Sequence, residues 1–455
     1  MKQVIKRSLY PLGLVCGSLF MLVSCQKDIK SSSQSALSES ASVEHGHLKQ
    51  TNTYSSEVVL KWMDMQIRLM RTATGIANNA FSRPFAYAGI ALYESVVPGM
   101  PSYQSIAPQL NGLSGLPQTG PGLAYHWPSC ANAALALINK KMFPATSAAN
   151  MASIDSLENA LNNSFSGEAD PQIINRSIEF GRNVAQAVFD WSETDGYKHA
   201  SDPYTPPSHP GLWVPTPPAN ANASTPYWGN LRTIVPGSID NTQPGPPIAY
   251  SEDPSSDFYK MVQHVYDASQ TLTQAQIDQA LYWRDIPGVT TPGHYLSILK
   301  QVLEIEQPAL DRSAVAYAFD AIIVNDAVIS VFKTKYTYNL VRPITYIRAV
   351  LGHSTWLSLL PTPAHPEYSS AHAVASAANA EALTILFGDN YSFTDHTYDY
   401  LGFPPRSFNS FHAIAEDAGN SRIFAGIHYQ PSVDTGLAQG TKVAWNITPK
   451  LKFQK

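Results

Sequence analysis

Polar residues in the last third of the chain have the types and the spacing of an anion-binding site. They form three clusters, which are Lys335 with Arg342-Pro343, Ser369-Ser370-Ala371-His372, and Ser421-Arg422 with Gly426 and His428. Cationic side chains, a hydroxyl group, free N–H groups at a helix start and imidazoles are the groups that hold a compact tetrahedral oxyanion. Residues 335–434 therefore predict an oxyanion pocket.

The first cluster supplies two long cations. Lys335 and Arg342 are seven residues apart, a rotation of about 700° on an α-helix, so both side chains would project from nearly the same face. Pro343 disfavours helical geometry at Arg342 and predicts that the helix ends or kinks there. The alternative is a pair of solvated surface cations near a helix end.

The second cluster predicts a helix start. Ala371–Ala378 is a strong helix former behind a turn-like segment, so the helix should begin near Ser369 or Ser370. Its free N–H groups and positive dipole end would attract an anion. His372 lies in the first turn, where the dipole lowers the pKa of its imidazole and keeps it able to exchange a proton near neutrality. The alternative is a plain Ser369 cap with an exposed His372.

The third cluster places an arginine and a histidine in an apolar run. An arginine in such a run is rarely buried without an anionic partner. Arg422 and His428 are six residues apart, about 120° on a straight helix, so they would approach an anion from different sides or across a break at Gly426. The alternative is a structural ion pair of Arg422 with Glu416 or Asp417.

The elements around these clusters predict an all-α fold. Helical spacing or helix-forming composition marks segments starting near Val58 and Ser82, at residues 131–142, 148–165 and 171–191, after a Thr273–Gln276 capping box, and at residues 294–305 and 312–334. No alternating strand pattern of useful length is present. Residues 202–250 are rich in proline and predict a long wrapping loop, with a domain linker as the alternative.

The N-terminus predicts secretion and lipid anchoring. Residues 1–24 have the basic start and short apolar run of a signal peptide, and they end at Cys25 in a sequence that looks like a bacterial lipobox. The alternative is an ordinary signal peptide that contains a cysteine. We expect a flexible tether over residues 25–53 and a single all-α catalytic domain over residues 54–455. Gln26 after the cysteine favours the outer membrane by resemblance to such lipoproteins.

Net charge and cysteine count argue against some binding partners and against a disulfide. A formal net charge of −5 makes nucleic acid or an anionic membrane surface an improbable partner. Cys16 lies in the predicted signal and Cys25 would be acylated, which leaves Cys130 alone and excludes a disulfide within the mature chain.

Taken in order, the clusters resemble the vanadium-dependent haloperoxidases and the related type-2 phosphatidic acid phosphatase superfamily of acid phosphatases. The family pattern is Lys, six residues, Arg-Pro, then Pro-Ser-Gly-His, then Ser-Arg, five residues, His. The matching residues are Lys335, Arg342, Pro343, Ser370, His372, Ser421, Arg422 and His428. Segments 316–319, 325–327 and 211–213 are also similar to bacterial haloperoxidase homologues, so the resemblance extends over most of the mature chain.

The resemblance implies helical bundles around a vanadate cofactor, with phosphate able to occupy the same site. Lys335, Arg342 and Arg422 would neutralise the anion. The Ser370 hydroxyl and the Ala371 N–H would donate hydrogen bonds to its equatorial oxygens.

The resemblance also implies the reacting groups. His428 would be the axial ligand of vanadium in a peroxidase, or the phosphorylated nucleophile of a phosphatase. His372 would be the general acid/base, acting on a peroxide oxygen or on a leaving alcohol.

Three positions depart from the family pattern. Ser369 replaces a proline, and Ala371 replaces a glycine. The N–H of Ala371 can still donate to the anion if the backbone there is not left-handed. The family aspartate that orients the axial histidine falls on Ser432, and Asp434, two residues later, is the candidate partner of His428 in its place.

His365 favours a peroxidase of the bromide- or iodide-oxidising kind. Bromoperoxidases of the family resemble this chain in having a histidine seven residues before the acid/base histidine, where the chloroperoxidase type has phenylalanine. A loop histidine packed on Tyr368 is the alternative. We expect hydrogen peroxide and halide as substrates. An acid phosphatase acting on a phosphoester, and a non-catalytic glycan-binding outer-membrane lipoprotein, are the competing hypotheses.

Overall fold

The protein is described by a computed structural model that covers residues 49–285, 289 and 291–455. These residues belong to one compact unit. The predicted signal peptide, Cys25 and the tether as far as residue 48 lie outside the described residues, so their predictions are not tested.

The described residues are mostly helical, which confirms the all-α prediction. The helices are α1 Glu57–Thr72, α2 Ser82–Val96, α3 Trp127–Met142, α4 Ala148–Phe165, α5 Pro171–Ser192, α6 Asp257–Gln270, α7 Gln274–Tyr282, α8 Thr291–Glu306, α9 Leu310–Tyr338, α10 Pro343–Ala349, α11 Ala371–Phe387, α12 Phe411–Phe424 and α13 Gln430–Ile447. One antiparallel pair, β1 (Phe393–Asp395) with β2 (Arg406–Phe408), is the sheet found there. These strands are too short to give a visible alternation in the sequence.

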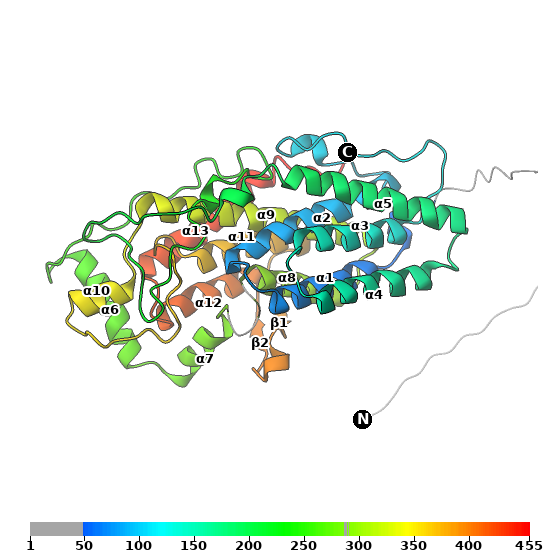
Figure 1. Ribbon diagram of the computed structural model, residues 1–455. Coiled ribbons are helices and arrows are strands. Elements are labelled where there is room, and N and C mark those ends of the chain that lie inside the picture. The colour runs from blue at the N-terminus through cyan, green and yellow to red at the C-terminus, as the bar shows by residue number, and fades with distance from the viewer. Residues whose placement is uncertain (1–48, 286–288, 290) are drawn as a thin grey trace, which may run out of the picture. The chain divides into compact units, whose positions relative to one another are not determined.

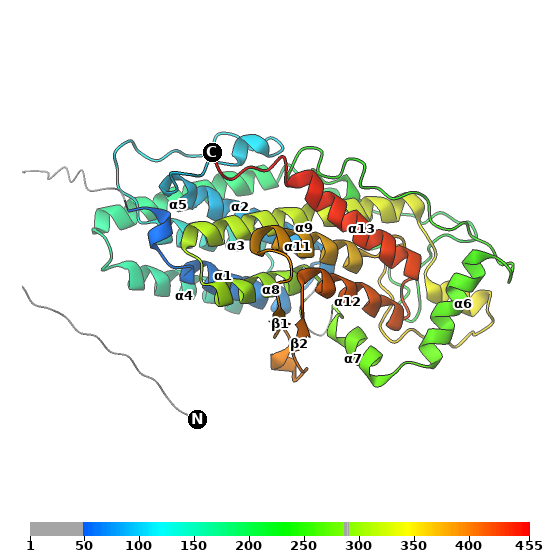
Figure 2. The same ribbon diagram turned by 180° about the vertical axis from the view of Figure 1, so that it is seen from behind.

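Helix α9 is the centre of the fold. It packs against α2 on one side and against α11 and α13 on another. Figures 1 and 2 show it running between these helices. It is long and apolar enough to cross a membrane, but 94% of its most apolar window is buried within the protein. A helix that is apolar all round is expected in such a core position.

The proline-rich segment 202–250 is a wrapping loop, as predicted, and not a linker between domains. It contains neither an α-helix nor a β-strand. The N–H of Trp213 donates to the carbonyl oxygen of Asn339 at 2.6 Å, and the N–H of Ile234 donates to the carboxylate of Asp326 in α9 at 2.8 Å. The loop is therefore fastened along the central helix.

The predicted tether extends too far. Thr51 is fully buried, and its hydroxyl donates to the carbonyl oxygen of Val96 at 2.9 Å. The indole N–H of Trp127 donates to the carbonyl oxygen of Lys49 at 2.8 Å. Residues 49–53 are therefore part of the folded body, because they form hydrogen bonds with polar groups of α2 and α3.

Close packing of α13 on α11 holds the two sides of the site together. A Cβ atom at Gly440 in α13 would overlap the carbonyl oxygen of Val374 in α11. We expect Gly440→Ala to lower the free energy of unfolding by about 1–3 kcal/mol, since a packed core resists added volume. Gly167→Ala is the matched control, because nothing lies near that position. Urea unfolding of both variants measures the difference, and equal stabilities would contradict this packing.

Candidate active site

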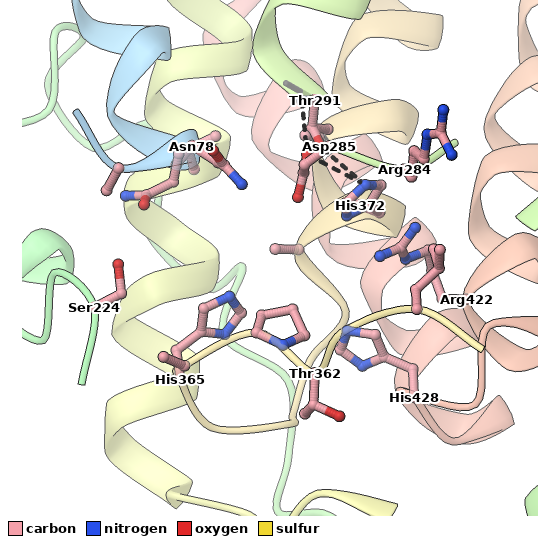
Figure 3. Close-up of a pocket in the computed structure, with 18 of the residues that line it drawn as sticks. Asn78, Ser224, Arg284, Asp285, Thr291, Thr362, His365, His372, Arg422 and His428 are labelled. Carbon is pink, nitrogen blue, oxygen red and sulfur yellow. Dashed lines mark hydrogen bonds and ion pairs between the residues drawn. The ribbon is translucent and has the colours of Figure 1, made fainter. Parts of the chain in front are cut away.

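The structure brings residues of the second and third clusters to one cavity of about 370 Å³. The predicted residues that line it are His365, Ala371, His372, Arg422 and His428. Figure 3 shows His372 and Arg422 on the same side of this pocket as His428, and His365 further across. Lys335, Arg342 and Ser370 do not line it and lie fully buried behind it.

A helix break, and not a shared helix face, places the first two cations. Helix α9 ends at Tyr338, and Asn339 takes a left-handed φ of 47°. Arg342 has extended backbone geometry and precedes α10, which Pro343 begins. The predicted end of the helix near Pro343 is confirmed. The prediction that both cations share one helix face is wrong, because the chain turns before it reaches Arg342.

Both cations instead hold the loop before α11. Lys335 Nζ donates to the carbonyl oxygens of Pro366 and Glu367 at 3.0 and 2.9 Å. Arg342 Nε donates to the carbonyl oxygen of His365 at 2.9 Å. Both side chains are fully buried, which overturns the surface-cation alternative.

His428 is fixed in the tautomer that a ligand imidazole needs. Arg342 NH1 lies 3.2 Å from His428 Nε2, and a guanidinium can only donate, so Nε2 is the acceptor. The proton of the neutral ring is then on Nδ1, which donates to Glu367 Oε1 at 2.6 Å. Burial and the nearby Arg342 hold the pKa of His428 well below its usual range. The ring is therefore neutral, with a lone pair on Nε2.

Glu367, and not Asp434, orients His428. Asp434 is exposed and accepts a hydrogen bond from the Gln430 side chain at 2.8 Å, so its predicted role beside His428 is wrong. Glu367 is fully buried and also accepts from the Tyr429 N–H at 3.1 Å. Burial raises the pKa of Glu367 to about 7, against the opposing effect of nearby cations. The sequence signal that could have identified Glu367 as the partner of His428 was its position, as an acidic residue in the turn just before α11.

His372 faces the cavity with its other ring nitrogen free. Its Nε2 lies 3.0 Å from the carbonyl oxygen of Trp283, which can only accept, so Nε2 carries the proton. Thr291 Oγ1 accepts from the same Nε2 at 2.9 Å and donates to Asp285 Oδ1 at 2.8 Å (Figure 3). No described residue contacts Nδ1 by a hydrogen bond, so Nδ1 is a proton acceptor. Sequence reasoning missed Trp283, Asp285 and Thr291, which are distant in the chain.

Burial, more than the helix dipole, sets the charge of His372. The residue is 7% exposed, so the alternative of an exposed His372 is wrong. Burial and the nearby Arg422 lower the pKa of His372 to about 3, against the opposing effect of Asp285. The predicted direction of the pKa shift is met, and the imidazole is neutral near neutral pH.

Because His372 is neutral in the folded protein, we expect the stability of the fold to decrease in acid. Its folded pKa lies below the ordinary value of 6.5, so the unfolded chain binds more protons between pH 6.5 and about 3, and stability falls as the pH falls through that window. His372→Gln removes this proton uptake. We expect its unfolding free energy to fall less steeply than that of the wild type, by up to about 1.4 kcal/mol per pH unit. Urea unfolding from pH 7 to pH 4 checks this, and parallel curves would contradict it.

Arg422 has unused donor capacity at the cavity. Its NH1 donates to the carbonyl oxygen of Trp283 at 2.9 Å, while its buried Nε has no partner among the described residues. The alternative ion pair with Asp417 is not formed, because Arg406 binds that carboxylate at 2.8 Å. Burial lowers the pKa of Arg422 to about 10, so the guanidinium stays charged.

The start of α11 supplies N–H groups, as predicted. Ser370 is the N-cap, and its side chain accepts from the Ala373 N–H at 3.5 Å. The N–H groups of Ala371 and His372 lie in the first turn, where no intrahelical acceptor exists. Ala371 is not among the residues with positive φ, so its N–H remains usable in place of the family glycine.

His365 is hydrogen-bonded to Arg342. Its Nδ1 lies 3.0 Å from Arg342 NH2 and 3.3 Å from the carbonyl oxygen of Pro366, and we assign the ring proton to Nε2 because the shorter contact is with a group that can only donate. Its ring lies 5.3 Å from that of Phe332, whereas Tyr368 packs against Tyr338. The alternative of a histidine packed on Tyr368 is therefore wrong.

The residues present fit an oxyanion bound through one imidazole. The three buried cations outnumber the two carboxylates near them, because Glu367 lies beside Lys335 and Arg342 and Asp285 acts on Arg422. Burial, together with the Arg342 charge, holds the pKa of Lys335 well below its usual range. An anion in the cavity would relieve this charge, and the unpartnered Nε of Arg422 is a donor still to be satisfied.

Known proteins with similar sequence or structure identify the family. The family model for the VCPO second helical-bundle domain matches residues 316–453. The crystal structure of a bacterial vanadium-dependent iodoperoxidase is 31% identical, with a TM-score of 0.81 over 88% of this chain and 98% of that one. Holo and apo structures of a bacterial vanadium-dependent chloroperoxidase are 15% identical, with TM-scores of 0.65 and 0.64 over 90% and 89% of this chain and 98% and 99% of theirs.

The chloroperoxidase likeness shows a shared fold only. No curated protein sequence matches significantly. The extent and identity of the match to the iodoperoxidase show that this chain belongs to the vanadium haloperoxidase superfamily.

Proposed function

We propose that this protein is a vanadate-dependent haloperoxidase that oxidises iodide or bromide with hydrogen peroxide. The observation that carries the proposal is the neutral His428, whose Nε2 lone pair faces buried cations while Glu367 holds Nδ1–H. This arrangement suits a tetrahedral oxyanion, and the similarity to an iodoperoxidase over 88% of the chain favours a peroxidase over a phosphatase.

His428 would hold the vanadate, with Arg342 and Arg422 balancing its charge and the first N–H groups of α11 donating to its oxygens. Vanadate bound there would supply a Lewis-acidic centre that activates hydrogen peroxide toward halide. The protein's part is to exclude water and to keep His428 Nε2 unprotonated. Glu367 sets the tautomer by accepting a hydrogen bond from Nδ1–H, while burial and the nearby Arg342 keep the ring neutral.

His372 would move the proton. Its Nε2–H is held by Trp283 and Thr291, so Nδ1 is the atom that takes a proton from hydrogen peroxide and returns it to the departing oxygen. Asp285, 3.7 Å from Nε2, stabilises the imidazolium while it carries that proton.

The decisive assay gives the purified protein vanadate, hydrogen peroxide and iodide or bromide, and follows halide oxidation. We expect turnover that depends on vanadate, with iodide faster than bromide because iodide is the more easily oxidised halide. Absence of turnover with both halides, together with phosphoester hydrolysis that vanadate inhibits, would favour the acid phosphatase instead.

We further propose that the protein is a lipoprotein anchored through Cys25, because that cysteine follows a lipobox-like sequence. Cells fed labelled palmitate should label the wild type and not the Cys25→Ser variant, and the label should fractionate with the outer membrane. Equal labelling of both variants would contradict the anchor.

A further inference from the structure

The cavity is larger than its anion requires. At about 30 Å³ per water, an oxyanion with four oxygens displaces roughly 120 Å³, which leaves about 250 Å³ of the cavity's 370 Å³. Peroxide and a halide ion are no larger than a few waters. The remaining volume is a little below the roughly 300–1,000 Å³ of pockets for drug-sized ligands, and at about eight waters it is room for a single small ring.

The free part of the cavity has an apolar wall. Val328 and Phe332, four residues apart on α9, both line it. Side chains at this spacing lie on the same face of a helix. They are only 4% and 1% exposed, and Pro361, Pro363 and Ala364 complete the apolar lining. A wall of this kind offers nothing to a hydrated halide, but it would pack against the flat face of a ring.

Polar groups without protein partners lie beside this wall. The side chains of Asn78 and Ser224 line the cavity, and no described residue forms a hydrogen bond with the Asn78 amide or the Ser224 hydroxyl. Figure 3 shows both on the side of the pocket away from Arg422, with His365 between them and His428. The Nε2–H of His365 adds a donor there, because Arg342 binds the other ring nitrogen.

We propose that this outer part of the cavity binds a small organic acceptor with an electron-rich, oxygen-bearing ring, such as a phenol, and that halogenation takes place there. The ring would pack on Val328 and Phe332. Its oxygen would be bound by Asn78, Ser224 and His365. The inference rests on the proposed haloperoxidase function, which supplies the oxidised halide.

The reaction balances without a further reagent. Hydrogen peroxide, iodide and one proton give hypoiodous acid and water. The I–O bond of hypoiodous acid then breaks while a ring carbon forms a C–I bond. The C–H bond at that carbon breaks, and its proton joins the departing hydroxide as a second water. The iodine atom is the group transferred, and peroxide is the oxidant of the whole sequence.

The ratio of ortho- to para-iodophenol formed from phenol tests the proposal, because this ratio does not depend on the total rate. We expect the enzyme to give a ratio that differs at least about twofold from that of chemically generated hypoiodite in the same buffer. Ser224→Phe should move the ratio to the chemical value, since the new ring fills the subsite. The backbone contacts of residue 224, with Ala364 and Tyr336, do not involve the replaced side chain.

Two controls keep the result interpretable. Ser166→Phe places the same side chain at an exposed position that does not line the cavity, and its ratio should equal that of the wild type. Saturation-transfer NMR of phenol with vanadate-free protein should show binding to the wild type and to Ser166→Phe, and a loss for Ser224→Phe, with thermal melting confirming that all three proteins fold.

The outcomes separate the two proposals. Oxidation of iodide to triiodide in the absence of phenol tests the peroxidase function alone. If triiodide forms but the wild-type ortho to para ratio equals that of free hypoiodite, or if phenol shows no saturation transfer, the acceptor subsite is wrong and the oxidised halide leaves before it reacts.

Discussion

Replacing His428 with alanine is expected to lower vanadate affinity and iodide oxidation at least about 1,000-fold. The physical reason is that His428 Nε2 carries a lone pair next to the buried Arg342, while Glu367 holds the proton on the opposite ring nitrogen. The cations alone would still attract anions, but without a bond that selects vanadium. Vanadium NMR of the bound anion, together with the iodide assay, measures both effects.

Two variants guard this prediction against misfolding. His428→Gln keeps a polar side chain next to Glu367 and Arg342, and it should lose activity as fully as alanine does. His264→Ala removes an exposed imidazole from α6 and should behave as the wild type. A His428→Gln protein that retains more than about a tenth of the wild-type turnover would show that the imidazole is not the ligand.

Replacing Glu367 is expected to have the second largest effect. Glu367→Gln should weaken vanadate binding about 10-fold and Glu367→Leu about 100-fold, the range found when the partner of a ligand histidine is removed. Glutamine can still accept the Nδ1–H of His428, although without a charge, whereas leucine cannot accept it. The negative charge of Glu367 also repels an incoming anion, but it does so from the far side of the imidazole ring. Its hydrogen bond to Nδ1–H makes Nε2 more basic, and Nε2 is the atom that would bind the anion. We therefore expect the gain in basicity to outweigh the repulsion.

The readout for Glu367 must separate positioning from simple structural support. Nitrogen NMR of the His428 ring should show the Nδ1–H tautomer in the wild type, and a mixture of tautomers in Glu367→Leu. Asp434→Asn is the matched control, because that carboxylate is exposed and pairs with Gln430. If Asp434→Asn weakened vanadate binding while Glu367→Gln did not, the assignment of the ring partner would be reversed.

Much of the fold could be predicted from the sequence because its signals are local. Helices α4 and α5 lie within a residue of their predicted bounds, and the Thr273–Gln276 capping box is present at the start of α7. The proline-rich loop was recognisable because its composition cannot form a helix. The place of residues 49–53 in the folded body was not recognisable, because polar residues are held there by single long-range contacts with α2 and α3.

In the candidate site, residue types could be predicted but their partners could not. The motifs supplied His372, Arg422 and His428, which the structure brings to one cavity. Glu367 and Asp285 were missed, because a carboxylate that binds a distant imidazole leaves no periodic pattern. Helical spacing also misled, since it put Lys335 and Arg342 on one face.

The most direct test is a crystal of the purified protein soaked in orthovanadate and measured at the vanadium absorption edge. We expect one strong anomalous peak in the cavity, bonded to His428 Nε2 and contacted by the Arg422 guanidinium. A peak that lies elsewhere, or vanadate held only by the cations with His428 Nε2 still bound to Arg342, would contradict this expectation.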